Sequence, residues 1–180
     1  MVLYTREDTA KTTSIFKGEI FNVWLYDVKK DGKQSSREIV EHNGGVCIAC
    51  MPGPDEVILI RQYRFAVDEE LIELPAGRVE LGEDRLLAAQ RELTEETGFK
   101  AADWLELPPM FSAPGFCTEL LTFYLARNVE FVGKNLDDDE ETEVVRVSLK
   151  EAWQLVVDGK IRDCKTVAAL GIVCHSKLPV

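Results

Sequence analysis

Two apolar runs in the first half of the chain constrain its fold most strongly. "VCIACM" (46–51) and "VILIRQYRF" (57–65) are joined by the turn sequence "PGPDE". Near-continuous apolar runs of this length are typical of strands that are covered on both faces. The runs therefore predict two central strands that pair as a hairpin, with other layers of the molecule packed on both sides of them.

Three segments have helical patterns. "EDRLLAAQRELTEETG" (83–98) has good helix formers throughout, apolar residues at helical spacing and Gly98 where a glycine commonly ends a helix. "LKEAWQLVVDG" (149–159) follows Ser148, and "KTVAALGIVCHS" (165–176) follows Asp163. Ser and Asp side chains accept hydrogen bonds from the first backbone N–H groups of a helix, so both are suitable N-caps.

The rest of the chain reads as strands and loops. "ELIELPAG" (70–77) and "LLTFYLARNV" (120–129) are extended, "WLELPPMFSAPGFCTE" (104–119) is loop-rich, and "DDDEETEVVRVS" (137–148) passes from an acidic turn into a strand. Strands therefore surround one helix, and two helices come last. This order predicts an α/β protein with a mixed sheet between helical layers.

The N-terminal residues form a separate β element. Two extended runs between Ser14 and Val40 flank Asp31-Gly32, a turn sequence typical of a β-hairpin. Residues 1–44 contain too little apolar surface for a core of their own, so we expect them to pack on the main domain, residues 45–180, or on a second subunit. A homodimer is the expected assembly.

Charge and hydropathy exclude two classes of partner. Asp and Glu number 32 against 21 Lys and Arg, which gives a net charge of −11. Binding to nucleic acid needs clustered basic residues, so none is expected. No stretch reaches the roughly 18 apolar residues of a membrane span, and the first residues lack the apolar core of a secretory signal. A cytoplasmic protein is predicted.

The cysteines predict reduced thiols. Five in a chain of 180 residues are an odd number, and a domain of this size needs no disulfide framework. Cys47 and Cys50 resemble a zinc or redox pair, but residues three apart on a strand point to opposite faces. With no second cysteine pair and only two histidines, structural buried thiols are expected instead of zinc.

Three glutamates share one face of the predicted helix 83–98. At 100° per residue, Glu96 lies about 40° from Glu92 on one side and Glu95 about 60° on the other. Like charges at this spacing destabilise a helix, and a hard divalent cation with oxygen ligands would compensate them. The alternative is an ordinary solvated helix face, on which Arg91 and Glu95 form a surface pair.

The spacing around these glutamates resembles the Nudix box. Gly77 is followed by five residues, Glu83, seven residues and then "RELTEETGF" (91–99), which matches every defined position of that motif. The resemblance implies a Nudix α/β/α sandwich with a loop-helix-loop that binds Mg²⁺ or Mn²⁺ and hydrolyses a nucleoside diphosphate linked to another group. It implies Glu92 and Glu96 as principal metal ligands, Glu95 as a further or water-bridged ligand, and Arg91 as the residue that orients Glu95. Glu83 lies nine positions before Glu92, so it would brace the motif or reach a second metal only from the turn before the helix.

Flanking segments are similar to the ADP-ribose pyrophosphatase branch of this family. They are "REIVEH" (37–42), "RQYR" (61–64), "ELPAG" (73–77), "SAPGFCTE" (112–119) and "DCKTVAAL" (163–170). By this resemblance Ala76 would offer its carbonyl oxygen to a metal, and Glu119 would activate water from a mobile loop. Arg64, Arg61 and Gly115 would contact substrate, although Arg61 and Arg64 lie three apart on a strand and face opposite ways.

Other residues have two interpretations each. Phe16, Phe21 and Trp24 would either stack on an adenine or pack in a core or interface, and strand alternation favours packing. The acidic run Asp137–Glu143 is typical of a solvated turn, although relatives have acidic residues near their sites there.

The expected reaction is hydrolysis of ADP-ribose to AMP and ribose 5-phosphate. The alternatives are a pyrophosphatase for another nucleotide sugar, such as a GDP- or UDP-hexose, or a noncatalytic Nudix domain that binds ADP-ribose as a regulator. A structural, metal-free fold is a further alternative. The box is complete and no basic DNA-binding segment is left over, which favours the enzyme.

Overall fold

The computed structural model describes residues 4–133 and 142–176, which divide into two compact units. One unit contains the residues up to Gly44 together with 111–120, and the other contains 45–110 and the described residues from 121 onward. The inclusion of 111–120 in the N-terminal unit was not predicted.

The larger unit is built on a seven-stranded sheet. In the order β10-β5-β4-β9-β8, strands β4 and β9 are parallel, whereas β5 is antiparallel to β4 and to β10. Strand β6 extends the pairing of β5, and β7 pairs with β4. The sheet is mixed, as predicted. Its strands are β4 (Gly45–Gly53), β5 (Glu56–Arg64), β6 (Glu69–Glu73), β7 (Ala76–Arg78), β8 (Phe99–Phe111), β9 (Leu120–Phe131) and β10 (Thr142–Ser148).

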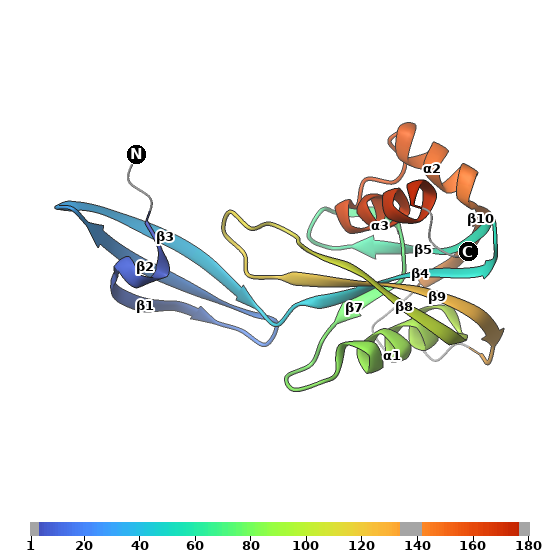
Figure 1. Cartoon of the computed structure of the whole chain (residues 1–180), viewed down its shortest axis with the longest axis horizontal. Helices are drawn as coiled ribbons and strands as arrows, with labels where there is room; N and C mark the ends of the chain where they lie inside the picture. Colours follow the sequence, from blue (N-terminus) through green and yellow to red (C-terminus); the bar gives the residue numbers. More distant parts are fainter. Residues whose placement is uncertain (1–3, 134–141, 177–180) are drawn as a thin grey trace. The chain divides into compact units, whose positions relative to one another are not determined.

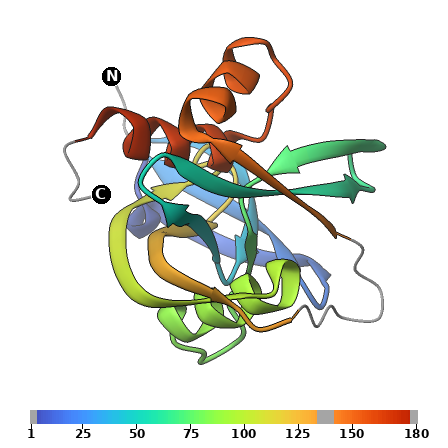
Figure 2. The ribbon, with the colours of Figure 1, turned by 90° about the vertical axis from the view of Figure 1, so that its right-hand side faces the viewer.

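Helices cover both faces of this sheet (Figures 1 and 2). Helix α1 (Arg85–Thr97) packs on one face, where Cys50 lies in the same apolar cluster as Leu93. Helices α2 (Leu149–Val157) and α3 (Cys164–His175) pack on the other face, where Cys47 shares a cluster with Leu170. The α/β/α sandwich is thus confirmed, and so is the prediction that the Cys47 and Cys50 side chains diverge.

Local sequence fixes both ends of α1. The Asp84 side chain accepts hydrogen bonds from the N–H groups of Leu86 and Leu87. At the other end Gly98 has φ 75°, and its N–H donates to Thr94 O. Glycine takes this left-handed conformation without the steric cost that a Cβ would add. The helix therefore starts after Glu83 and contains Glu92, Glu95 and Glu96.

The N-terminal unit contains a short 3-10 helix and a three-stranded antiparallel sheet of order β1-β2-β3. The turn at Asp31 and Gly32 has positive φ at both residues, as a tight hairpin requires. The predicted simple hairpin is wrong in its first arm, which turns back after Gly18 to make two strands. A Cβ on Gly18 would lie 2.6 Å from the Phe16 ring, so glycine permits this turn. The elements are η1 (Arg6–Asp8), β1 (Thr9–Lys17), β2 (Phe21–Lys30) and β3 (Lys33–His42).

The segment 104–111 is a strand, which corrects its prediction as loop. Pro108 and Pro109 suggested a loop because proline lacks the N–H group that a strand donates to its neighbour. They lie in β8, which is the last strand of the sheet order. An edge strand tolerates proline because its outer side has no neighbour to receive a hydrogen bond.

The cysteines agree with the expectation of free thiols. All five cysteines are free, and Cys47 and Cys50 are buried. Burial raises the pKa of the Cys50 thiol to about 12, which keeps it protonated at neutral pH. Among the described residues, no helix is long and apolar enough to cross a membrane.

Candidate metal-binding and catalytic site

The loop before α1 approaches the helix most closely at Gly77. A Cβ on Gly77 would lie 1.9 Å from Cδ of Glu92 and 2.0 Å from its Oε1. Glycine is therefore required if the Glu92 carboxylate is to lie against the β7 backbone. The Glu92 residue is only 8% exposed. The box glycine is explained by this contact, since it brings a carboxylate and a backbone strand together.

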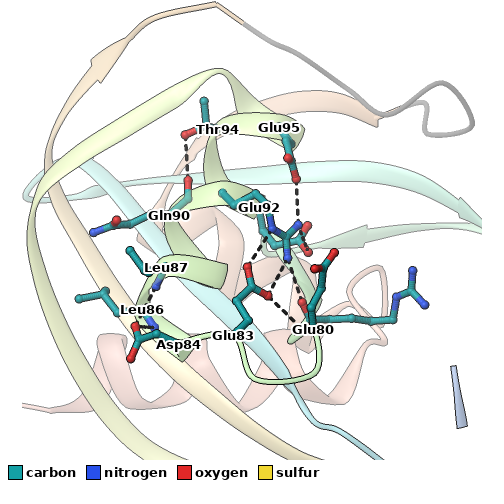
Figure 3. Close-up of polar contacts among 11 residues, drawn as sticks. Glu80, Glu83, Asp84, Leu86, Leu87, Gln90, Glu92, Thr94 and Glu95 are labelled. Carbon is teal, nitrogen blue, oxygen red and sulfur yellow. Dashed lines mark hydrogen bonds and ion pairs between the residues drawn. The ribbon is translucent and has the colours of Figure 1, made fainter.

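Arg91 binds three of the box glutamates at once. Its Nη1 lies 2.8 Å from Glu92 Oε1 and 3.0 Å from Glu95 Oε2, and its Nε lies 3.1 Å from Glu83 Oε1. Figure 3 shows Glu83 in the turn before α1 and Glu92 and Glu95 on the helix, with dashed lines for the hydrogen bonds that these glutamates make. The predicted contact between Arg91 and Glu95 is present. Contacts with Glu83 and Glu92 accompany it.

The charge of Arg91 is secured by these carboxylates. Burial would lower the pKa of its guanidinium, but the hydrogen bonds and charges of Glu83, Glu92 and Glu95 raise it above its ordinary value. In return, the hydrogen bond from Arg91 lowers the pKa of the Glu83 carboxyl. Glu83 thus binds Arg91 from the turn before α1.

Glu96 joins the helix to the same loop from a buried position. It is 1% exposed, and its Oε2 accepts a hydrogen bond of 2.9 Å from the N–H of Ala76. Its backbone oxygen accepts a hydrogen bond of 2.9 Å from Thr142 Oγ1. Ala76, Gly77, Glu92 and Glu96 therefore form one joint between β7 and α1, which we call the loop-helix joint.

The donor atoms of this joint fit a hard divalent cation. They are the carboxylate oxygens of Glu92 and Glu96 and the backbone oxygen of Ala76, and Glu95, which shares Arg91 with Glu92, adds a third carboxylate beside the joint. None of these groups is sulfur or imidazole, and oxygen is what Mg²⁺ and Mn²⁺ prefer. Within residues 4–133 and 142–176, no three acidic, His or Cys side chains already form a metal-sized cluster. Arg91 and the Ala76 N–H instead engage the individual carboxylates.

The two predicted substrate-binding arginines have different carboxylate partners. Arg64 donates from Nε and Nη2 to the two oxygens of Glu73, at 2.8 Å each. Arg61 Nη1 lies 2.9 Å from Glu143 Oε2, and both of those side chains are exposed. Their opposite directions agree with the strand geometry. The rest of the acidic run, 137–141, lies outside the described residues.

The predicted base and loop glycine belong to the N-terminal unit. Glu119 Oε1 lies 3.5 Å from His42 Nδ1, which accepts a hydrogen bond of 3.0 Å from the Gly44 N–H. The Val40 N–H donates to Phe116 O, and the Thr118 N–H donates to Val40 O. These bonds fasten the loop that contains Gly115 and Glu119 to β3.

The aromatic residues of the N-terminal unit contact other residues of that unit. Phe16 and Phe21 contact each other, with ring centroids 5.7 Å apart, and both are at least 40% exposed. Trp24 Nε1 donates a hydrogen bond of 2.9 Å to Glu41 Oε2.

Comparison with known proteins agrees with the box. A family model described as NUDIX domain matches residues 41–169, well over half of the chain. The chain belongs to the Nudix family.

Curated relatives of this Nudix chain have several names. It is 34% identical to the ADP-ribose pyrophosphatase of Bacillus subtilis (strain 168) and 35% identical to the methanol dehydrogenase activator of Bacillus methanolicus. Each comparison covers 91% of this chain and 90% of the relative. It is 31% identical to the GDP-mannose pyrophosphatase of Escherichia coli (strain UTI89 / UPEC), over 85% of this chain and 86% of that one.

A solved structure shares the Nudix fold. The crystal structure of an ADP compounds hydrolase matches with a TM-score of 0.82 and 25% identity, over 96% of this chain and 92% of that chain. This likeness supports the α/β/α architecture with its N-terminal β element.

One group of buried charges next to the Nudix box was not predicted. Glu73 is 1% exposed and binds both Arg64 and Lys165, which lies in α3. A charged residue inside the apolar sequence "LIELP" was the available signal. Its partner could not be identified from the sequence, because Lys165 lies 92 positions away.

Proposed function

We propose that the chain hydrolyses ADP-ribose to AMP and ribose 5-phosphate with Mg²⁺ or Mn²⁺. The loop-helix joint is the observation that supports this most directly, because it buries Glu92 and Glu96 against Ala76 and Gly77. Its setting in a Nudix chain similar to ADP-ribose pyrophosphatases adds the substrate class.

The residues would share the work as follows. Glu92 and Glu96 hold the cation, Glu95 adds an oxygen directly or through water, and the Ala76 carbonyl completes the protein ligands. When bound, the cation would neutralise the pyrophosphate oxygens and make a water more acidic. Arg91 keeps Glu83, Glu92 and Glu95 in place, and Arg64, Arg61 and Gly115 contact the substrate. The new bond joins the water oxygen to a phosphorus, and the bond from that phosphorus to the bridging oxygen breaks.

An acidic protein can bind such an anionic substrate because a bound cation reverses the local charge. The net charge of −11 therefore does not oppose the proposal. It does oppose a nucleic-acid partner, and none is proposed.

Substrate choice is tested by comparing nucleotide sugars under one set of conditions. We expect kcat/KM for ADP-ribose to exceed that for GDP-mannose and UDP-glucose by about tenfold or more, a difference that a few pocket contacts supply. Release of the nucleoside monophosphate with Mg²⁺ or Mn²⁺ is the measurement. Preference for GDP-mannose would favour the alternative that the E. coli relative suggests. If the protein hydrolysed none of these substrates, the remaining alternative would be a noncatalytic domain that binds ADP-ribose.

Glu119 is proposed as the base that takes a proton from the attacking water. Glu119→Gln keeps the size of the side chain and removes the basic oxygen, so kcat should fall by about 100-fold or more while KM changes little. Steady-state kinetics with ADP-ribose measure this. Glu130→Gln, at an exposed position of β9, is the matched control. Normal kinetics in Glu119→Gln would place the base elsewhere, with Glu95 of the box as the next candidate.

A homodimer in the cytoplasm is proposed as the working form. The N-terminal unit exposes Ile15, Phe16, Ile20 and Phe21 by 40% or more, an apolar surface that suits a second copy of the chain. Sedimentation of the full chain tests this, and a monomer at micromolar concentration would contradict it. The five free cysteines fit a reducing compartment, and cell fractionation tests the location.

A further inference from the structure

A buried group of charges lies between β6 and α3. We call it the Glu73 cluster, and it consists of Arg64, Glu73, Asp163, Lys165 and Thr166. Glu73 accepts two hydrogen bonds from Arg64 and one from Lys165 Nζ. Lys165 Nζ also lies 2.9 Å from Asp163 Oδ2. The Glu73, Lys165 and Asp163 side chains are 1%, 13% and 14% exposed, so this part of the network is interior, whereas Arg64 at its edge is 37% exposed.

The opposite charges in the cluster stabilise one another. Burial would raise the pKa of the Glu73 carboxyl, but Arg64 and Lys165 lower it below its ordinary value. Burial would likewise lower the pKa of Lys165, but Asp163 and Glu73 raise it. Buried ion pairs add little net stability compared with apolar residues of similar size, so their better-attested use is to fix one arrangement.

The arrangement that the cluster fixes is the path of the chain from β6 to β7. Glu73 is held by its side chain, and the next residue, Leu74, donates its N–H to Thr166 Oγ1 at 2.8 Å. Thr166 Oγ1 in turn donates to Asp163 Oδ2 at 2.6 Å, which leaves its lone pairs directed to Leu74. Two residues of α3 therefore hold two successive residues of this path.

The same path ends at the loop-helix joint. Pro75 O accepts a hydrogen bond of 2.8 Å from the Ile48 N–H, and the Ala76 N–H donates to Glu96. Each of the four residues from Glu73 to Ala76 is thus fixed at one atom or more. The rigid piece connects α3, on one face of the sheet, to Glu96 of α1, on the other face (Figure 1).

We propose that Lys165 and Thr166 are positioning residues for the metal site. From α3 they hold Glu73 and Leu74, and this places the Ala76 backbone against Glu96 in the loop-helix joint. The proposal rests on the proposed function in one respect, namely that Glu96 and Ala76 are metal ligands. Neither Lys165 nor Thr166 is proposed to touch metal or substrate.

Thr166 provides the sharper test because valine has the shape of threonine without its hydroxyl, whereas serine keeps the hydroxyl and loses only a methyl group. Thr166→Val removes the hydroxyl and orphans the Leu74 N–H, whereas Thr166→Ser keeps the hydroxyl. Residues that orient metal ligands typically contribute 10- to 100-fold to metal affinity, so we expect the Mn²⁺ Kd to rise by about tenfold or more in Thr166→Val. Thr166→Ser should restore it to within about threefold of wild type.

Lys165 is tested in the same way, with a control from the loop that precedes α3. Lys165→Met should raise the Mn²⁺ Kd by about tenfold or more, since second-shell losses are of this size. Arg162→Met removes an equal charge from an exposed pair with Glu69, and it should leave the Kd unchanged. Glu73→Gln combined with Lys165→Met should lose no more affinity than the larger single effect, because both act through one contact.

The measurement is the electron paramagnetic resonance signal of unbound Mn²⁺, titrated with apo-protein, with circular dichroism to show that each variant is folded. Wild-type affinity in a folded Thr166→Val variant would overturn the proposal. A loss of Mn²⁺ affinity in Arg162→Met equal to that in Lys165→Met would overturn the role of Lys165. A wild-type protein that binds no Mn²⁺ would overturn the proposal for both residues. Failure of wild type to hydrolyse ADP-ribose would sink the proposed function instead, because metal affinity is measured without substrate.

Discussion

Replacing Glu96 with glutamine should abolish most hydrolysis of ADP-ribose while the protein stays folded. Glutamine keeps an oxygen that can accept the hydrogen bond from the Ala76 N–H, so the loop-helix joint retains its 2.9 Å contact. It removes the negative charge that a dication needs from a ligand. Residues that merely orient metal ligands contribute 10- to 100-fold, so loss of a ligand should lower kcat/KM by more than about 100-fold.

The experiment compares kcat/KM for ADP-ribose with the melting temperature of the same sample. Glu70→Gln, at an exposed position of β6, is the matched control for loss of one negative charge and should retain wild-type kinetics. Full activity in Glu96→Gln would show that the metal site lies elsewhere. An inactive variant that had also unfolded would be uninformative about the metal, and for that reason Mn²⁺ affinity is measured in parallel.

The positions of the box residues could be predicted from sequence because they depend on short-range geometry. Helical spacing alone placed Glu92, Glu95 and Glu96 on one arc, and the nine positions from Glu83 to Glu92 predicted that Glu83 could join them only from the turn before the helix. The structure adds what spacing cannot give. Glu96 turns to the Ala76 N–H, while Glu92 and Glu95 share Arg91. Which carboxylate faces which neighbour depends on packing against β7, a contact that the linear pattern does not encode.

The Glu73 cluster shows that contacts between residues far apart in the sequence could not be predicted. Both of its motifs, "ELPAG" and "DCKTVAAL", stand out in the sequence, but nothing in either one says that Glu73 and Lys165 touch. Their contact depends on how α3 packs on the sheet, so it required the tertiary structure. The partner of Arg64 could not be predicted for the same reason. A strand position predicts its direction, but only the fold reveals that Glu73 meets the Nε and Nη2 atoms.

The predicted strand boundaries were wrong where one residue type is compatible with two kinds of local structure. Gly18 is unremarkable in an extended run, yet it is the point at which one predicted strand becomes two. Pro108 and Pro109 normally indicate a loop, but an edge strand accepts them. The larger surprise is the placement of 111–120, because the loop with Glu119 is hydrogen-bonded to Val40 and His42 of the N-terminal unit.

Gly77→Ala should lower activity as strongly as loss of a metal ligand, although it adds only a methyl group. The new Cβ would lie 1.9 Å from Glu92 Cδ, far inside van der Waals contact, so the Glu92 carboxylate must leave its position. Glu92 is a flexible side chain, so the fold can accommodate this movement at a modest cost in stability. The metal site cannot accommodate the same movement, because a shift of about 1 Å in a catalytic group can cost about 100-fold in rate.

A large loss of metal binding and activity with only a small loss of stability would show that Gly77 places a metal ligand. A glycine with a purely structural role would lose stability instead. Gly171→Ala is the matched control, since its Cβ would meet only Trp153 at 3.9 Å, an ordinary contact, and alanine favours a helix more than glycine does. We expect Gly171→Ala to be fully active, and Gly77→Ala to be folded, weak in Mn²⁺ binding and slow with ADP-ribose. Normal Mn²⁺ affinity in Gly77→Ala would contradict the placement of Glu92 at the metal, since the carboxylate would then have moved without consequence.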